Sequence, residues 1–297
     1  MILSRGTRVF LWAVAAVILF LIYLPLVVVV IGSFNPAKTF GWPPEGFSLT
    51  WWSAALHNDG LRQAIWTSLQ VAFFAVTVSL LLGTMLSFAV ARYRWFGRET
   101  VSFLIVLPIT LPGIVTGVAL QNAFLNYSVL GISLGFWTVV IGHATFTIVV
   151  VFNNVVARLR RTATSYEDAS MDLGAHTFQT FWHVTLPSVR SALAAGALLA
   201  FGLSFDEIIV TQFTAGPAVT TLPIWIYNNF TRPNQAQIVN VVAAVLILVS
   251  ILPVYATQRL AGEDSGTRRR RGRRRDQGEG DLAFTAATAP AAEFPQA

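Results

Sequence analysis

The 297-residue chain contains no cysteine and few charged residues. Without cysteine it has no disulfide framework, no cysteine-ligated zinc site and no thiol nucleophile. Charged residues make up 11% of the sequence and apolar residues 55%, whereas an ordinary soluble domain is about 25% charged. So few charges do not cover a soluble surface of this size, and a chain this apolar is not disordered. The composition indicates a protein whose surface faces lipid.

Lysine is almost absent, since Lys38 is the single lysine among 20 basic residues. A P-loop needs the pattern G-x-x-x-x-G-K-[ST], and the sequence around Lys38 lacks it. The motifs H-E-x-x-H and G-x-S-x-G are also absent. His176 and His183 share a helix face but have no third ligand, which is a weak case for a metal site. We therefore expect no catalytic residue, metal ligand or cofactor in this chain.

Long uncharged runs predict six membrane spans, because a spanning helix needs about 20 mostly apolar residues. The first run is 23 residues long and has no A-x-A cleavage site at its end, so it is interpreted as a retained helix and not a signal peptide. The polar stretch 126–135 divides a longer run into two spans. The predicted spans are 9–31, 65–91, 100–125, 136–157, 190–213 and 237–258.

The basic residues predict the orientation of these spans. With a cytoplasmic N-terminus, 17 basic residues lie in cytoplasmic segments and three in outer segments, as the positive-inside rule requires. The predicted fold is an all-α membrane protein with six transmembrane helices and both termini in the cytoplasm. Residues 1–260 form the membrane domain, and residues 261–297 a disordered Arg-rich tail. The tail is expected to contact anionic lipid and not nucleic acid.

Three polar or helix-breaking features lie inside the predicted spans. The segment LPITLPG, residues 107–113, predicts a bent or interrupted helix, which either packs against neighbours or borders a pathway. His143 is expected to form an interhelical hydrogen bond and not a proton relay. Asp206 and Glu207 are the only carboxylates within a predicted span. They either pair with a partner's arginine, lie at the outer interface, or form a negative site that attracts a cation, with Asp206 the stronger candidate.

The long loop between the fourth and fifth spans, residues 158–189, predicts two short helices. Ser165 caps the first, over residues 166–173, and Gly174 permits a turn. The second covers residues 176–183, and Pro187 is expected to stop it. Three aromatic residues of the second helix fall on one apolar face, which serves either docking or internal packing: Phe178, Phe181 and Trp182.

A gapped pattern in this loop resembles the EAA loop of binding-protein-dependent ABC importer permeases. The family pattern is E-A-A, three residues, G, nine residues, I, one residue, L-P, and the spacing here is the same. Asp168, Ser170 and Val184 are conservative departures from it. The matching residues are Asp168, Ala169, Ser170, Gly174, Val184, Leu186 and Pro187. The resemblance covers most of residues 1–260, and segments 91–98, 107–120 and 201–223 are most similar to the second permease of spermidine/putrescine-type importers.

The resemblance implies a type I ABC importer permease in the bacterial plasma membrane, forming half of a translocation pathway. The implied partners are a second permease, two ATP-binding subunits that hold ATP and Mg, and an extracytoplasmic solute-binding protein. The loop then docks into an ATPase groove, and the expected cargo is a small cation, a polyamine such as spermidine or putrescine. A permease for another small solute is the first alternative. A stand-alone channel or ion-coupled carrier is the second, although a carrier usually has more intramembrane ionisable residues and two similar halves.

Overall fold

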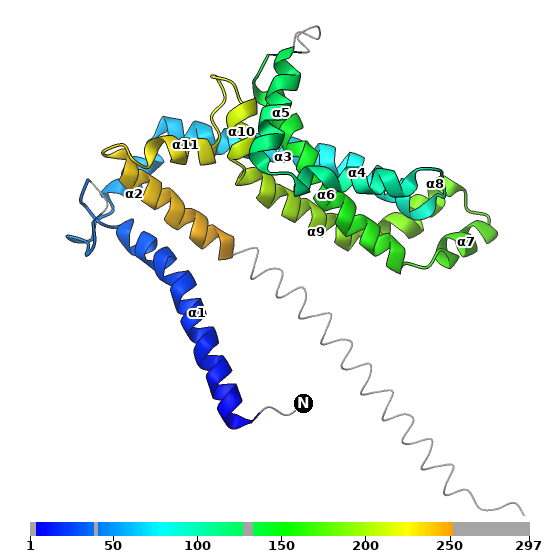
Figure 1. The fold of residues 1–297 in the computed structure, drawn as a ribbon, viewed down its shortest axis with the longest axis horizontal. Helices are drawn as coiled ribbons and strands as arrows, with labels where there is room; N and C mark the ends of the chain where they lie inside the picture. The colour runs from blue at the N-terminus through cyan, green and yellow to red at the C-terminus, as the bar shows by residue number, and fades with distance from the viewer. Residues whose placement is uncertain (1–3, 39–40, 127–132, 252–297) are drawn as a thin grey trace, which may run out of the picture. The chain divides into compact units, whose positions relative to one another are not determined.

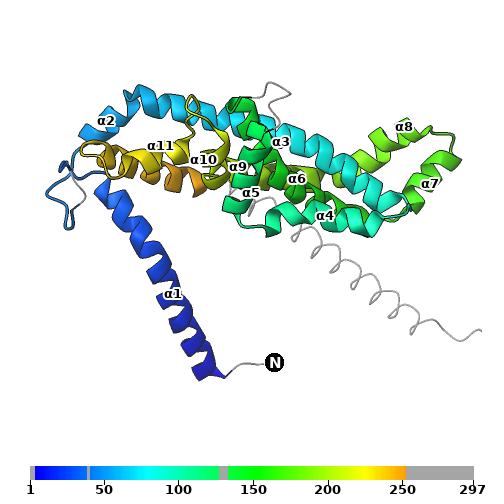
Figure 2. The ribbon, with the colours of Figure 1, turned by 45° about the horizontal axis from the view of Figure 1, so that its top comes forward.

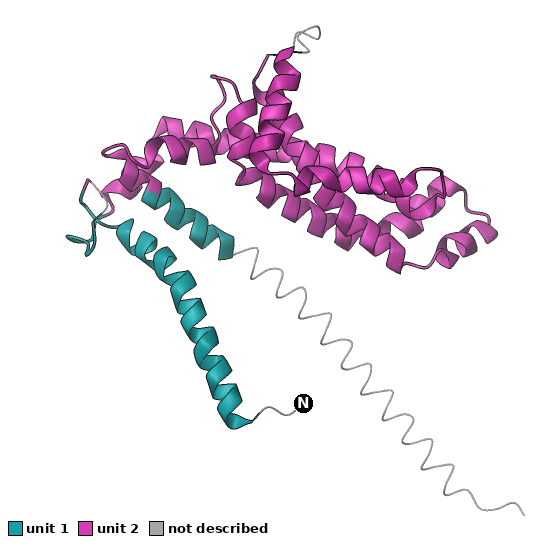
Figure 3. Cartoon of the chain, in the orientation of Figure 1, with its two compact units in different colours: residues 1–37, 41–48, 240–297 teal, residues 38–40, 49–239 magenta. Residues whose placement is uncertain are grey.

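The computed structural model describes residues 4–38, 41–126 and 133–251. Every regular element in these ranges is helical (Figure 1), which confirms the all-α class. The chain divides into two compact units, which Figure 3 colours separately. The predicted tail, 261–297, lies outside the described residues.

The first unit, residues 1–37, 41–48 and 240–297, contains helix α1 (Arg5–Gly32). Ser4 caps α1, because its side chain accepts a hydrogen bond of 3.2 Å from the backbone N–H of Thr7. The most apolar stretch of α1 has no buried residue. A helix that is apolar all round is suited to contact lipid or other membrane helices.

The second unit comprises residues 38–40 and 49–239. Its helices begin with α2 (Thr50–Leu56), α3 (Asp59–Arg92), α4 (Arg98–Thr110), α5 (Gly113–Asn126) and α6 (Phe136–Arg161). They continue with α7 (Ser165–Asp172), α8 (Thr177–Thr180), the π-helical turn η2 (Phe181–Thr185), α9 (Leu186–Phe205), α10 (Ile209–Thr214) and α11 (Leu222–Asn229). A further helix, Gln235–Ile251, begins in this unit.

Helices α3, α6 and α9 run side by side and form the core of the second unit (Figures 1 and 2). Fully buried aliphatic side chains of α6 and α9 meet here, and partly buried residues of α3 pack against them. Polar links cross the same core. The hydroxyls of Ser79 and Thr147 lie 2.6 Å apart, and Ser87 donates to the backbone carbonyl of Phe152 at 3.1 Å. Such interhelical hydrogen bonds stabilise helix pairs that lipid surrounds.

The predicted bend at residues 107–113 is confirmed. Helices α4 and α5 together are apolar enough for one span, and they meet at an angle of 104°. Leu111, between them, has extended backbone angles, because the ring of Pro112 disfavours helical geometry in the residue before it. Val115 and Thr116 donate to the carbonyl of Pro112 and start α5.

Four described helices are long and apolar enough to cross a membrane, and the bent pair makes five. Three of the four, α1, α3 and α6, coincide with predicted spans. The sixth predicted span, 237–258, is described only as far as Ile251. The six-span count and the orientation therefore remain predictions.

The fifth predicted span, 190–213, is wrong at its end, because its helix stops at Phe205, and that helix begins well before residue 190. One continuous helix runs from Thr177 to Phe205, so Pro187 does not stop it. The π-helical turn η2 precedes this proline, and the N–H of Leu186 bonds to the carbonyl of Phe181. A π-turn rearranges the hydrogen bonds at the point where proline removes a donor and crowds the preceding turn.

The same helix ends earlier than predicted because a carboxylate starts a new one. Asp206 is the C-cap residue of α9, and the side chain of Glu207 accepts a hydrogen bond of 2.8 Å from the backbone N–H of Val210. This bond satisfies one of the free donors at the start of α10, as a helix cap does. The predicted single span is therefore two helices with a polar break at residues 206–208.

Candidate functional site

The loop between α6 and α9 folds as a helical hairpin, with α7 and α8 at one end of the second unit (Figure 2). Gly174 has a φ of +90°, a conformation that side chains with a Cβ resist. Its N–H donates to the carbonyl of Met171, and the N–H of Ala175 donates to that of Ser170. Gly174 thus ends α7 and turns the chain toward α8, as the sequence predicts.

Some of the loop residues singled out from the sequence face the protein interior. The Ser170 hydroxyl lies 3.1 Å from that of Thr180, which is buried, and this contact joins α7 to α8. The ring of Phe181 packs edge-on against Phe88 of α3, with centroids 5.4 Å apart. Leu186 packs against the core cluster of α6 and α9. The contacts of Phe181 and Leu186 hold the hairpin on the helix bundle, and the contact of Ser170 holds its two short helices together.

Other loop residues face outward. Phe178 is 72% exposed and Trp182 is 50% exposed, and their rings lie 6.0 Å apart. Leu173, at the turn, is 90% exposed. Asp168 and Ala169 are exposed on α7. The predicted aromatic face is therefore divided, since Phe181 packs inward while Phe178 and Trp182 are open to a partner. Val184 is half-buried and Pro187 is exposed.

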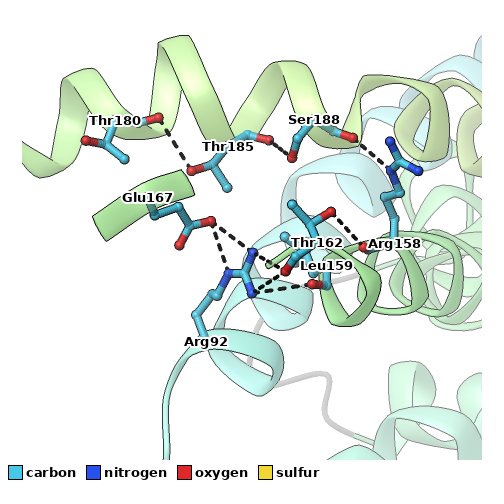
Figure 4. Close-up of polar contacts among 8 residues, drawn as sticks. All are labelled: Arg92, Arg158, Leu159, Thr162, Glu167, Thr180, Thr185 and Ser188. Atoms are coloured by element: carbon cyan, nitrogen blue, oxygen red, sulfur yellow. Dashed lines mark hydrogen bonds and ion pairs between the residues drawn. The ribbon is translucent and has the colours of Figure 1, made fainter. Parts of the chain in front are cut away.

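An ion pair that sequence reasoning missed anchors this loop. Arg92, the last residue of α3, lies 3.0 Å from a carboxylate oxygen of Glu167 in α7. Its guanidinium also donates to the carbonyls of Leu159 and Thr162 at 3.3 and 3.4 Å (Figure 4). Arg92 and Glu167 are 75 positions apart, so no local spacing reveals them. The signals in the sequence that could have suggested the pair are a basic residue at the end of a predicted span, Arg92, and an acidic residue in the first turn of a predicted helix, Glu167.

The polar break after α9 lies beside a buried histidine. His143 Nδ1 is 2.8 Å from Ser204 Oγ, and Nε2 is 2.8 Å from Thr211 Oγ1. These contacts join α6 to the end of α9 and to α10, which confirms that His143 forms interhelical hydrogen bonds. His143 is seven residues from the start of α6, which corresponds to about 10 Å along the helix axis. The break at residues 206–208 thus lies well inside the length of α6 and not at its end.

The two carboxylates at the break have different surroundings. Glu207 is half-buried, and its carboxylate caps α10. Asp206 is exposed. Of the two, Asp206 is therefore the carboxylate that is free of a capping bond and open to a ligand. Within the described ranges, no three His, Asp or Glu side chains form a group that suits a metal ion.

Comparisons with known proteins agree with this architecture. The family described as "Binding-protein-dependent transport system inner membrane component" matches residues 76–262. The spermidine/putrescine transport system permease protein PotC of Escherichia coli (strain K12) is 35% identical over 240 residues, which are 81% of this chain and 89% of PotC. The putrescine transport system permease protein PotI of the same strain is 32% identical over 240 residues, 79% of this chain and 85% of PotI.

Two solved structures share the fold. A bacterial ABC transporter involved in the import of the acidic polysaccharide alginate has a chain with a TM-score of 0.68 at 18% identity, and the match covers 86% of this chain and 99% of that one. An amino acid ABC transporter with histidines gives a TM-score of 0.51 at 15% identity, covering 71% of this chain and 100% of that one.

Proposed function

The chain belongs to the binding-protein-dependent transport system inner membrane components, and on this premise we propose that it forms half of the translocation pathway of an ATP-driven polyamine importer. As a member of this family it is a multi-pass protein of the bacterial plasma membrane and a transport component, not an enzyme. Its partners are other components of an ABC importer.

The finer assembly that we propose has a second permease, two ATP-binding subunits and an extracytoplasmic solute-binding protein. ATP and Mg bind to the ATP-binding subunits, because the only lysine of this chain lies outside a P-loop pattern. The exposed face of Phe178 and Trp182 supports docking on an ATP-binding subunit, since clustered exposed aromatic side chains are typical of interface anchors.

The observation that carries the mechanism is the continuous helix from Thr177 to Phe205. Its 29 residues extend over about 43 Å, from the exposed aromatic face to the polar break. Movement of the docked hairpin, driven by closure of the ATP-binding subunits, would therefore displace the break as well. In this proposal the helix transmits the movement, and opening at the break admits or releases the solute.

The cargo is proposed from the relatives and from one carboxylate. PotC and PotI are named for spermidine and putrescine transport, and both compounds carry positive amine groups. Asp206 is exposed and lies within a predicted span, and a negative charge at such a position favours a cation. The fold alone does not select this cargo, because the two solved relatives are named for an acidic polysaccharide and for amino acids.

A permease for another small solute is the alternative that the shared fold keeps open. A stand-alone channel or ion-coupled carrier does not fit membership in a transport system with separate components. An uptake experiment distinguishes a polyamine cargo from another small solute. Energy-dependent uptake of labelled spermidine and putrescine is measured in cells with and without this chain.

Loss of polyamine uptake on deletion, restored by the wild-type chain, is the expected result. Unchanged uptake with an ATP-binding subunit still co-purifying would reject the polyamine and keep the permease. The docking surface is tested with Phe178→Ser combined with Trp182→Ser, which should abolish recovery of the ATP-binding subunit. Phe96→Ser is the control, because Phe96 is fully exposed in a turn outside the hairpin. Equal recovery with all three chains would refute docking at this face.

A further inference from the structure

Arg92 joins three helices whose relative positions matter if the hairpin moves. It ends α3, and its Nε donates to Glu167 Oε1 of α7 at 3.1 Å while Nη2 lies 3.0 Å from the same oxygen. Its Nη1 donates to the carbonyls at the end of α6 (Figure 4). The guanidinium fork suits this task, because it presents several donors in one plane. The last carbonyls of a helix lack partners within the helix and carry partial negative charge.

The surroundings make this pair stronger than a surface ion pair. The side chains of Arg92 and Glu167 are 12% and 19% exposed, so water screens their attraction only weakly. Hydrogen bonds between ionised groups are shorter and stronger than those between neutral groups. By contrast, the ion pair of Arg62 and Asp59 has side chains 69% and 92% exposed, a situation in which pairs contribute little.

Helix α7 has few other attachments to the bundle. None of its residues is buried, and besides the chain itself it is held by the contact of Ser170 with Thr180. That contact leads to α8 and onward to α9. The ion pair leads instead to α3 and α6. Helix α7 is therefore connected to the bundle by two separate routes, while Phe181 of η2 contacts Phe88 of α3 independently of α7.

We propose that the Arg92–Glu167 pair is the positioning contact that transmits movement of α7 to α3, so that ATP-driven displacement reaches two spans and not only the helix that continues from the hairpin. The inference rests on the proposed function of the hairpin as the ATPase-coupling loop. It assigns different roles to two adjacent acidic residues. Glu167 points toward its own bundle, whereas Asp168 is exposed and is left for the docking partner.

The chain's lack of cysteine allows a direct test in the complete importer. Met85→Cys places a fluorophore on the exposed side of α3, and Leu199→Cys places one on the exposed side of α9. In the otherwise wild-type complex, reconstituted in proteoliposomes, ATP with vanadate should change the emission of both labels. In Glu167→Gln the change at α3 should fall several-fold while the change at α9 is retained; a residual change at α3 is expected because Phe181 still contacts Phe88.

Uptake per ATP provides a second readout that a merely structural contact would not alter. Glu167→Gln should lower the number of labelled spermidine molecules imported per ATP hydrolysed by about fivefold or more, the range of a typical coupling between sites. Arg92→Gln should lower it at least as far, since it also loses the α6 contacts. The double variant should match Arg92→Gln alone, because the two residues act as a pair. Arg94→Gln is the control, an exposed arginine two residues away.

The outcomes separate this inference from the proposed function. If the wild-type complex contains no ATP-binding subunit or shows no ATP-driven emission change, the proposed function fails. If the wild type responds and Glu167→Gln responds equally at both labels, only the role of the ion pair is refuted. A variant that loses thermal stability or complex recovery in parallel with both emission changes also refutes it, since the pair would then serve folding alone.

Discussion

Replacement of Gly117 by alanine tests how closely α5 and α10 pack beside the polar break. A Cβ added at Gly117 would lie 2.6 Å from Cδ2 and 3.2 Å from Cγ of the Phe213 ring. Carbon atoms in contact prefer about 3.5–4.0 Å, so the ring must retreat by roughly 1 Å. A Cβ added at Gly113 would meet Ile209 at 3.7 Å, an ordinary contact. Gly113→Ala, in the same pair of helices, is therefore the matched control.

The expected difference follows from these distances. Overpacking of this kind costs about 1–3 kcal/mol when neighbours must leave their preferred positions. Alanine favours a helix interior over glycine by about 1 kcal/mol, and this gain offsets part of the cost at Gly117, whereas Gly113 is the first residue of α5. Because the 2.6 Å approach is severe, the cost should lie in the upper part of the range, and Gly117→Ala should be about 1–2 kcal/mol less stable than Gly113→Ala. Since Phe213 belongs to α10, its displacement should also lower solute uptake.

The stability comparison is made on the assembled importer in one detergent, by thermal unfolding and by titration with a denaturing detergent. Gly117→Ala should unfold at a lower temperature than Gly113→Ala and wild type. Equal midpoints for the two alanine variants would mean that Phe213 moves aside at no cost. In that case the α5–α10 contact would not be a close-packed interface, and the reasoning from the clash would be refuted.

Three further outcomes are expected. His143→Ala leaves the hydroxyls of Ser204 and Thr211 without their partner, and each such hydrogen bond contributes about 0.6–1.7 kcal/mol in a membrane protein. The variant should therefore unfold at a lower concentration of denaturing detergent than wild type, and an unchanged midpoint would contradict this. Gly174→Asn should still co-purify with the ATP-binding subunit and Gly174→Val should recover less of it, because asparagine tolerates positive φ and a β-branched residue does not. Greater recovery with valine than with asparagine would refute the role of this turn. Asp206→Asn should raise the spermidine concentration needed for half-maximal uptake without reducing assembly, and identical uptake kinetics would exclude Asp206 as a cation site.

The sequence predicts the long helices well because charge marks where the chain meets water. Predicted spans 9–31, 65–91 and 136–157 correspond to α1, α3 and α6 within a few residues. The bend between α4 and α5 is also predictable, since proline acts on its own neighbours through sterics alone. These features depend on local chemistry, which a single sequence contains in full.

The errors occur where distant or unexpected contacts replace a local preference. Proline usually ends a helix, but η2 accommodates Pro187 within a continuous one. No local pattern predicts that π-turn. Glu207 appears in the sequence as a charge inside a span, whereas its carboxylate caps α10. Arg92 meets Glu167 only after α3 and α7 are brought together. Contacts across such distances are decided by tertiary packing and are not visible in the spacing of residues.

The π-turn η2 also explains why the hairpin needs bracing if it is to act as a lever. Between the hairpin and the polar break, α9 contributes 20 residues, about 30 Å of helix, which matches the apolar thickness of a bilayer. Helices bend most readily at interruptions such as η2, so force applied at α8 would be absorbed there. Two contacts oppose that bending: Phe181 packs on Phe88, and Arg158 donates to the carbonyl of Ser188 at 2.9 Å. The inward-facing residues of the loop are therefore fixed by their contacts with α3 and α6. Within the described part of the chain, the outward-facing residues make no such contacts and can be matched to a partner.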